Sequence, residues 1–188
     1  MARAGLTTEL VVRAGADLAD EVGFDAVTPS TLARALGVRV ASLYSHVAGA
    51  DDLRQRIALL ALDELADRAS EALAGRAGRE ALEAFADAYR DYGREHPGRY
   101  AAMQTRLSPE AAASGPGGRH AELARAVLRG YGLGETEETH AVRLIGSVVR
   151  GFTVLELGGG FDHSPPPPDA TWPRILDGVD AVLRSWAR

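Results

Sequence analysis

The stretch from residue 28 to residue 47, TPSTLARALGVRVASLYSHV, predicts two short helices joined by a tight turn. Thr28 is a suitable N-cap, and Pro29 fits the first helical position because its missing N–H would be unsatisfied there in any case. Gly37 can end the first helix, since glycine adopts the left-handed conformation of a helix C-terminus without strain. A second helix is then expected over about 40–47.

The spacing within this stretch is typical of a helix-turn-helix motif. Ala33 is small enough for the second helix to cross closely, and Gly37 supplies the turn. Leu43 and Val47 lie one helical turn apart, where they can anchor the second helix. In a DNA-binding motif of this kind, the second helix enters the major groove with its N-terminal residues at the base edges. An ordinary helical hairpin has the same spacing, so the spacing alone leaves both interpretations open.

The charge pattern favours the DNA-binding interpretation. No carboxylate occurs between Asp25 and Asp51, although the chain has 26 acidic residues among 188. The charged side chains that remain in this stretch are Arg34 and Arg39, together with the titratable His46. A surface that approaches phosphates is expected to lack negative charge in this way.

The rest of the sequence predicts an all-α chain. Ala and Leu are abundant, and alternating strand patterns are scarce. A loop is expected around 114–118, and Pro165–Pro168 is expected to form a stiff connector. The apolar periodicity predicts further helices over 6–23, 51–73, 82–96, 99–107, 119–131, 136–157 and 171–187.

Composition excludes several classes of protein. The absence of cysteine excludes a disulfide framework, a thiolate metal site and a cysteine nucleophile. No apolar run is long enough to span a membrane and no signal peptide is recognisable, so a cytoplasmic protein is expected. The net charge of −5 argues against a broadly basic nucleic-acid coat, but not against a local DNA-binding surface.

Candidate metal and catalytic motifs are weak. Glu137 and His140 form a single Glu-x-x-His pair, whereas a di-iron bundle needs two such pairs and further carboxylates. The glycines at 158–160 are not followed by the Lys-Ser/Thr of a phosphate loop, and no Gly-x-Ser-x-Gly elbow is present. We therefore expect no metal, no cofactor and no enzymatic activity.

Two parts of the chain resemble the TetR family of transcriptional repressors. The N-terminal resemblance covers about fifty residues, and the C-terminal part resembles the subclass with a so-called WHG domain. The motifs that carry the first resemblance are Val22-Gly23-Phe24-Asp25-Ala26-Val27-Thr28, Leu32-Ala33, Leu36-Gly37-Val38 and Ala41-Ser42-Leu43-Tyr44-Ser45-His46-Val47. Those that carry the second are His96-Pro97-Gly98-Arg99-Tyr100 and Arg150-Gly151-Phe152 with Leu155-Glu156 and Gly158-Gly159.

The resemblance implies a helix-turn-helix DNA-binding domain over 1–48 and a helical ligand-binding and dimerisation domain over 49–188. It implies phosphate contacts from the hydroxyl groups of Thr28 and Ser30 and from Tyr44 and His46. The residues that it places in the major groove are Arg39, Val40, Ala41, Ser42 and Ser45.

Two departures from the family pattern concern DNA binding. The lysine that the family usually has at the start of the fourth helix is Ala50 here, followed by Asp51 and Asp52, and the usual Ser or Glu ahead of the recognition helix is Arg39. With few cations left to contact phosphates, we expect weak non-specific binding and a shallow salt dependence. A helical ligand-binding dimer that has lost DNA binding is the alternative interpretation.

The C-terminal half is expected to bind a small, largely apolar effector and to form a homodimer. The apolar stripes of 136–157 and 171–187 would pair as a four-helix bundle, with Gly146 and Gly151 allowing close approach. The resemblance implies that effector binding would tilt helix 51–73 and release a repressor from a palindromic operator. Candidate pocket residues, which could equally be ordinary core, are Tyr89, Tyr92, Tyr100, Met103, Phe152 and Glu156.

Overall fold

The computed structural model describes residues 5–187, and these residues form helices and no strand, which confirms the all-α prediction. The chain forms two compact units. Unit 1 contains the described residues up to Glu64 together with Glu95–Gly117, and unit 2 contains Leu65–Arg94 and Gly118 onward. The predicted boundary after residue 48 separates two functional domains and not two compact units, and it stays a prediction.

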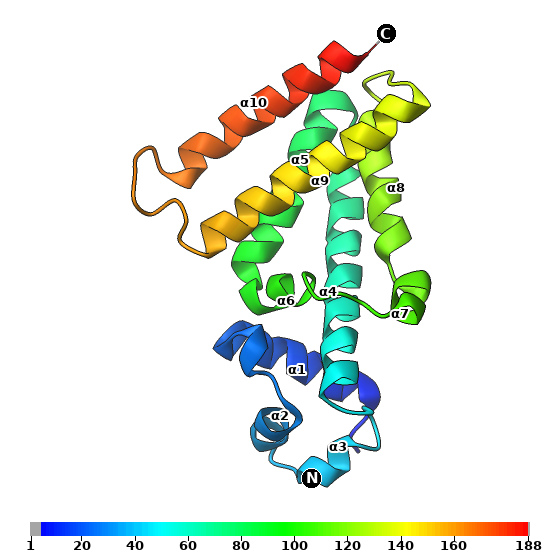
Figure 1. Ribbon diagram of the computed structural model, residues 1–188, viewed down its shortest axis with the longest axis vertical. Helices are drawn as coiled ribbons and strands as arrows, with labels where there is room; N and C mark the ends of the chain where they lie inside the picture. Colours follow the sequence, from blue (N-terminus) through cyan, green and yellow to red (C-terminus); the bar gives the residue numbers. More distant parts are fainter. Residues whose placement is uncertain (1–4, 188) are drawn as a thin grey trace. The chain divides into compact units, whose positions relative to one another are not determined.

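Unit 1 holds the helices at the N-terminal end of the chain (Figure 1). Its core combines apolar side chains from the helices between residues 8 and 58 and from Ala102, including the fully buried Leu32 and Leu43. Its elements are α1 (Thr8–Val22), the short 3-10 helix η1 (Phe24–Ala26), α2 (Pro29–Leu36), α3 (Val40–Leu43), the first part of α4 (Ala50–Leu73), α6 (Pro97–Ala102) and α7 (Pro109–Ser114).

Unit 2 is built around the end of α4 and four further helices, of which α9 and α10 form an antiparallel pair (Figure 1). Its core is rich in aromatic rings: the Phe152 ring lies 4.8 Å from that of Trp172 and 4.9 Å from that of Phe161, measured between centroids. The four helices are α5 (Gly78–Glu95), α8 (Gly117–Leu128), α9 (Glu135–Leu157) and α10 (Pro168–Trp186).

A close contact joins α1 and α6 in unit 1. Gly98 lies so near α1 that a Cβ at this position would be 1.9 Å from the Ala19 carbonyl oxygen. The next residue, Arg99, is 7% exposed. Its guanidinium donates to Asp17 and, at 2.9 Å, to Asp20, and its backbone N–H donates to Asp20 at 2.9 Å. A glycine and a buried arginine in sequence therefore pin α6 to α1.

A second buried arginine ties together three helices of unit 2. The Arg90 guanidinium of α5 donates to Glu156 of α9 at 2.6 and 2.9 Å and to Asp169 of α10 at 2.7 Å. Arg94 donates to both of these carboxylates as well. Burial raises the pKa of Glu156, but hydrogen bonds and charge from Arg90, and then from Arg94, lower it by more. The pKa of Glu156 therefore lies below its usual range.

This network makes the stability of the protein sensitive to acid. The carboxylate of Glu156 has a lower pKa in the folded chain than in the unfolded chain, so its contribution is complete above about pH 4.5 and is lost as the pH falls through the folded value. We expect the free energy of unfolding of wild type, measured with urea, to fall steeply from pH 5 to pH 3. The fall should be shallower in Glu156→Gln. Equal slopes in the two proteins would contradict this assignment.

Several helix bounds differ from the predicted ones. The short helix expected at 99–107 is α6, which begins two residues earlier because Pro97 occupies its first position, and which ends at Ala102. The segment before the expected loop forms α7, since Ser108 caps it and Pro109 starts it, and α8 begins at Gly117, inside that loop. Pro168 starts α10 rather than ending the connector. Regular helix in α3 ends at Leu43, and the chain continues to 46 in turns.

Candidate nucleic-acid interface

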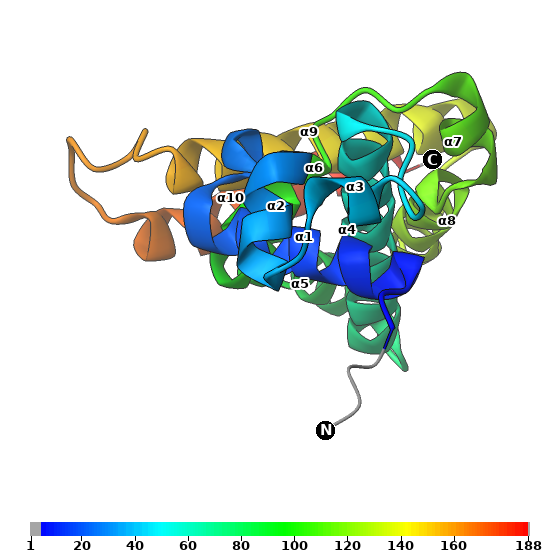
Figure 2. The ribbon, with the colours of Figure 1, turned by 90° about the horizontal axis from the view of Figure 1, so that it is seen from below.

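The predicted helix-turn-helix is present in unit 1, with α2 and α3 side by side across a tight turn (Figures 1 and 2). Thr28 caps α2 as predicted: its Oγ1 accepts the Thr31 N–H at 3.1 Å, and the Thr31 hydroxyl accepts the Thr28 N–H at 2.8 Å. Gly37 follows α2 in the left-handed conformation, at φ +67°. Leu43 and Val47 are buried, as the spacing predicts.

Most of the residues predicted to contact DNA are accessible. Tyr44, a large aromatic side chain, is 56% exposed. Val40 is partly buried and packs against the core of unit 1, and His46 is half-buried. The exposed members of the set are Thr28, Ser30, Arg39, Ala41, Ser42, Tyr44 and Ser45.

Two exposed guanidinium groups on this motif have no partner. Arg34 of α2 and Arg39 before α3 make no side-chain hydrogen bond or ion pair with any residue between 5 and 187. Many other arginines of unit 1 are engaged, among them Arg13 with Glu9 and Arg56 with Asp52. Because no carboxylate lies between Asp25 and Asp51, the positive charge of the motif is not neutralised locally.

One of the two acidic residues at the start of α4 has its negative charge compensated within the protein. Asp52 accepts the Ala48 N–H at 2.8 Å and pairs with Arg56 at 2.9 Å, so it caps the turn into α4 and its charge is compensated. Burial raises the pKa of Asp52, but the Ala48 amide and Arg56 lower it by more, which keeps the carboxylate ionised. Asp51 is exposed, and Ala50 is the first residue of α4.

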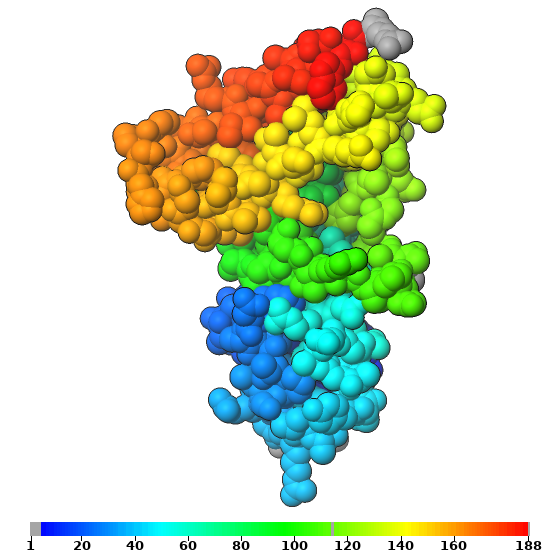
Figure 3. Space-filling view, viewed as in Figure 1, coloured from blue at the N-terminus to red at the C-terminus, as the bar shows by residue number. Residues whose placement is uncertain are grey.

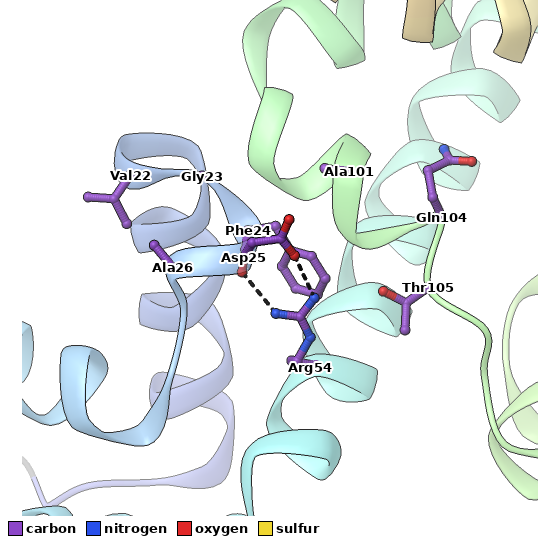
Figure 4. Close-up of a pocket in the computed structure, with 9 residues that line it drawn as sticks. All are labelled: Val22, Gly23, Phe24, Asp25, Ala26, Arg54, Ala101, Gln104 and Thr105. Atoms are coloured by element: carbon purple, nitrogen blue, oxygen red, sulfur yellow. Dashed lines mark hydrogen bonds and ion pairs between the residues drawn. The ribbon is translucent and has the colours of Figure 1, made fainter. Parts of the chain in front are cut away.

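An open hollow of about 470 Å³ lies beside the motif, between the α1–α2 connection, α4 and α6 (Figure 4). At its centre Arg54 donates to the Phe24 carbonyl at 3.2 Å and to Asp25 at 3.0 Å, and its guanidinium carbon lies 3.9 Å from the centroid of the Phe24 ring. Arg54 therefore fixes the start of the helix-turn-helix to α4. Sequence reasoning missed this role because the pairing spans 29 residues.

The six predicted pocket residues belong to different units. Tyr100 and Met103 are buried in unit 1, whereas the other four are in unit 2. Within unit 2, Tyr89 bonds to His120, and Phe152 packs in the aromatic core. Tyr92 is buried, and Glu156 has the ion-pairing role described above. The interpretation of these residues as a pocket stays a prediction.

The outer surface of α9 and α10 carries exposed apolar and small residues, and both helices reach one face of unit 2 (Figure 3). Val154, Leu155 and Val182 are 44%, 53% and 38% exposed. A Cβ added at Gly146 or Gly151 would meet nothing within 4 Å. This face is open at both glycines, and its use as a dimer interface stays a prediction.

The part of the chain that the structure describes lacks two other kinds of feature. No group of three or more histidine, aspartate or glutamate side chains is arranged to hold a metal ion. None of its helices combines the length and the apolar character needed to cross a membrane.

A tight hairpin of two helices, with an exposed surface that carries no carboxylate, is the architecture of a helix-turn-helix DNA-binding motif. Comparisons with known proteins identify the family of the whole chain. Residues 82–179 match the family model described as the tetracyclin repressor-like C-terminal domain. An uncharacterized HTH-type transcriptional regulator of Mycobacterium tuberculosis is 35% identical over 164 residues, which cover 85% of this chain and 74% of that protein. The chain belongs to the TetR family of transcriptional regulators, which are not enzymes.

Solved structures share the fold over nearly the whole chain. A variant of TetR from Acinetobacter baumannii, in complex with minocycline, is 24% identical with a TM-score of 0.73, covering 97% of this chain and 99% of that one. The TetR family protein ActR of Streptomyces coelicolor, in complex with (S)-DNPA, is 21% identical with a TM-score of 0.73, covering 98% and 100%.

Proposed function

We propose that this chain is a dimeric repressor that binds a palindromic operator through α3 and is released by a small, largely apolar effector. The observation that carries the proposal is the exposed surface of the helix-turn-helix, with two unpaired arginines and no carboxylate from 26 to 50. On this proposal Ala41, Ser42 and Ser45 face the major groove, and Tyr44 contacts phosphate.

Dimerisation through α9 and α10 is the second part of the proposal. It is supported by the exposed apolar side chains on both helices and by glycines that leave room for a second backbone. A two-fold dimer would present two copies of α3 to DNA, so half-sites would lie about one helical turn, roughly 34–36 Å, or a multiple of it, apart.

Effector release is the third part. Two fold relatives, named above, are in complex with small organic molecules, which supports a similar role for the aromatic side chains of unit 2. Signal transfer would use α4, which is continuous from Ala50 to Leu73, together with the α1–α6 contact at Gly98 and Arg99. A coupling of about 1–3 kcal/mol between effector and operator would give a 5–150-fold release.

Selection of genomic fragments by the purified protein tests DNA binding. We expect enrichment of a palindromic fragment, and loss of its binding in Ser42→Ala and Tyr44→Ala, because both side chains are exposed and their removal leaves the core intact. Arg129→Ala is the control, since Arg129 is exposed and lies in unit 2 outside every proposed surface. Failure to enrich any fragment at low salt would favour the ligand-binding dimer that has lost DNA binding.

The salt dependence of operator binding is expected to be shallow. Arg34 and Arg39 are the cations available on the motif, so a dimer has about four cationic contacts at most and a slope of log K against log salt no steeper than about −4. Titrations from 50 to 300 mM salt measure it. A slope as steep as about −8 would show that other cations contact the DNA.

Substitution of Leu155 with arginine is expected to disrupt the dimer. The side chain is 53% exposed, so the folded protomer tolerates the change, but a charge would be buried at the proposed interface. Sedimentation should show a monomer for Leu155→Arg. Val22→Arg is the matched control, since Val22 is 52% exposed and lies in unit 1. A Leu155→Arg protein that stays dimeric at micromolar concentration would contradict this interface.

A further inference from the structure

Arg39 occupies a position where its side chain does not serve the fold. It is the N-cap residue of α3, at φ −78° and ψ 142°, and makes no capping hydrogen bond. Helix N-caps favour Ser, Thr, Asp and Asn, and this chain uses Thr7, Thr28 and Ser108 in that way, each accepting a backbone N–H. A cation at the positive end of a helix is also electrostatically unfavourable. Local stability therefore does not account for Arg39.

The guanidinium of Arg39 is available for an external partner. The residue is exposed, and its side chain has no hydrogen bond or ion pair within residues 5–187. Arg54 shows the contrast: it lies in the same unit and is held by Phe24 and Asp25. No carboxylate of the motif competes for Arg39, since none lies between residues 26 and 50.

The neighbouring side chains on α3 that would face the major groove are small and offer at most single hydroxyl groups to the bases. Ala41 has a methyl group only, and Ser42 has one hydroxyl. The Ser45 hydroxyl already donates to the Ser42 carbonyl at 2.9 Å. From 39 to 45, Arg39 alone carries parallel N–H donors, and such a pair fits the O6 and N7 acceptors of guanine in the major groove.

We propose that Arg39 determines sequence specificity by donating two hydrogen bonds to a guanine at one fixed position of each operator half-site. The inference rests on the DNA-binding function proposed above. It gives Arg39 a different role from Tyr44 and Arg34, whose contacts with phosphate would carry no sequence information.

Binding to a set of operator fragments tests the proposal. Each base pair is changed symmetrically in both half-sites, and guanine is also replaced by 7-deazaguanine, which lacks the N7 acceptor. We expect wild type to lose about 5–150-fold per half-site at one G·C pair. Arg39→Ala should bind the original fragment more weakly and be indifferent to changes at that pair. Arg34→Ala and Arg129→Ala should keep the wild-type preference.

Arg39→Ser separates recognition from folding. Serine is a good N-cap, so this variant is expected to unfold at the same or a higher temperature than wild type while losing the preference for guanine. If Arg39→Ala and Arg39→Ser keep the wild-type preference at every position, and only lower the salt slope by about 1 per protomer, Arg39 contacts phosphate and the proposal is wrong. If wild type binds no fragment, the proposed function fails as well.

Discussion

Replacement of Gly98 by alanine is expected to destabilise the protein by about 3 kcal/mol or more. The new methyl group would lie 1.9 Å from the Ala19 oxygen and 2.1 Å from the Ala19 carbonyl carbon. These are backbone atoms, so no side-chain rotation can relieve the overlap, and α6 would have to move away from α1. The movement would also separate Arg99 from Asp20.

Thermal unfolding measures the effect, with an expected fall of roughly 6–12 °C in Tm for a chain of this size. Gly118→Ala is the matched control, because Gly118 is an exposed helical glycine whose added Cβ would meet nothing within 4 Å, and there we expect no loss. An unchanged Tm in Gly98→Ala would contradict the close contact between α1 and α6.

Replacement of Arg90 by methionine is expected to cost about 3–5 kcal/mol. Glu156, whose side chain is 10% exposed, would keep Arg94 but lose the two-point contact with Arg90. The substitution would also remove the cation that lies 5.3 Å from the centroid of the Phe152 ring and 5.2 Å from that of the Trp172 ring.

A double variant distinguishes lost pairing from lost packing. Arg90→Met combined with Glu156→Gln removes the carboxylate that the first substitution leaves paired with Arg94, so urea unfolding should give a loss smaller than the sum of the two single variants. Additive losses would mean that Arg90 acts through packing alone.

The local signals in the sequence predicted the helix-turn-helix well. Thr28, Pro29 and Gly37 each fix the chain within a few residues of themselves, so their roles follow from propensity and capping alone. The same kind of signal is present at Ser108-Pro109, but the turn residues at 114–118 predict a loop close behind it, and α7 was not predicted.

The long-range ion pairs could not be predicted. Arg99 finds Asp17 across 82 residues of sequence, and Arg90 finds Glu156 and Asp169 across 66 and 79. No periodicity in a single sequence indicates which of its 26 carboxylates will meet which arginine. The lack of carboxylates from 26 to 50 left Arg34 and Arg39 without a partner nearby in sequence, and the structure gives them no distant partner among the described residues.

Hydroxyl-radical footprinting on the selected fragment tests most directly whether two copies of α3 bind one palindrome. The account predicts two protected regions related by a two-fold axis, with centres about 34–36 Å or a multiple of that apart, and loss of both in Tyr44→Ala. A single protected region, or protection that Tyr44→Ala leaves unchanged, would contradict it.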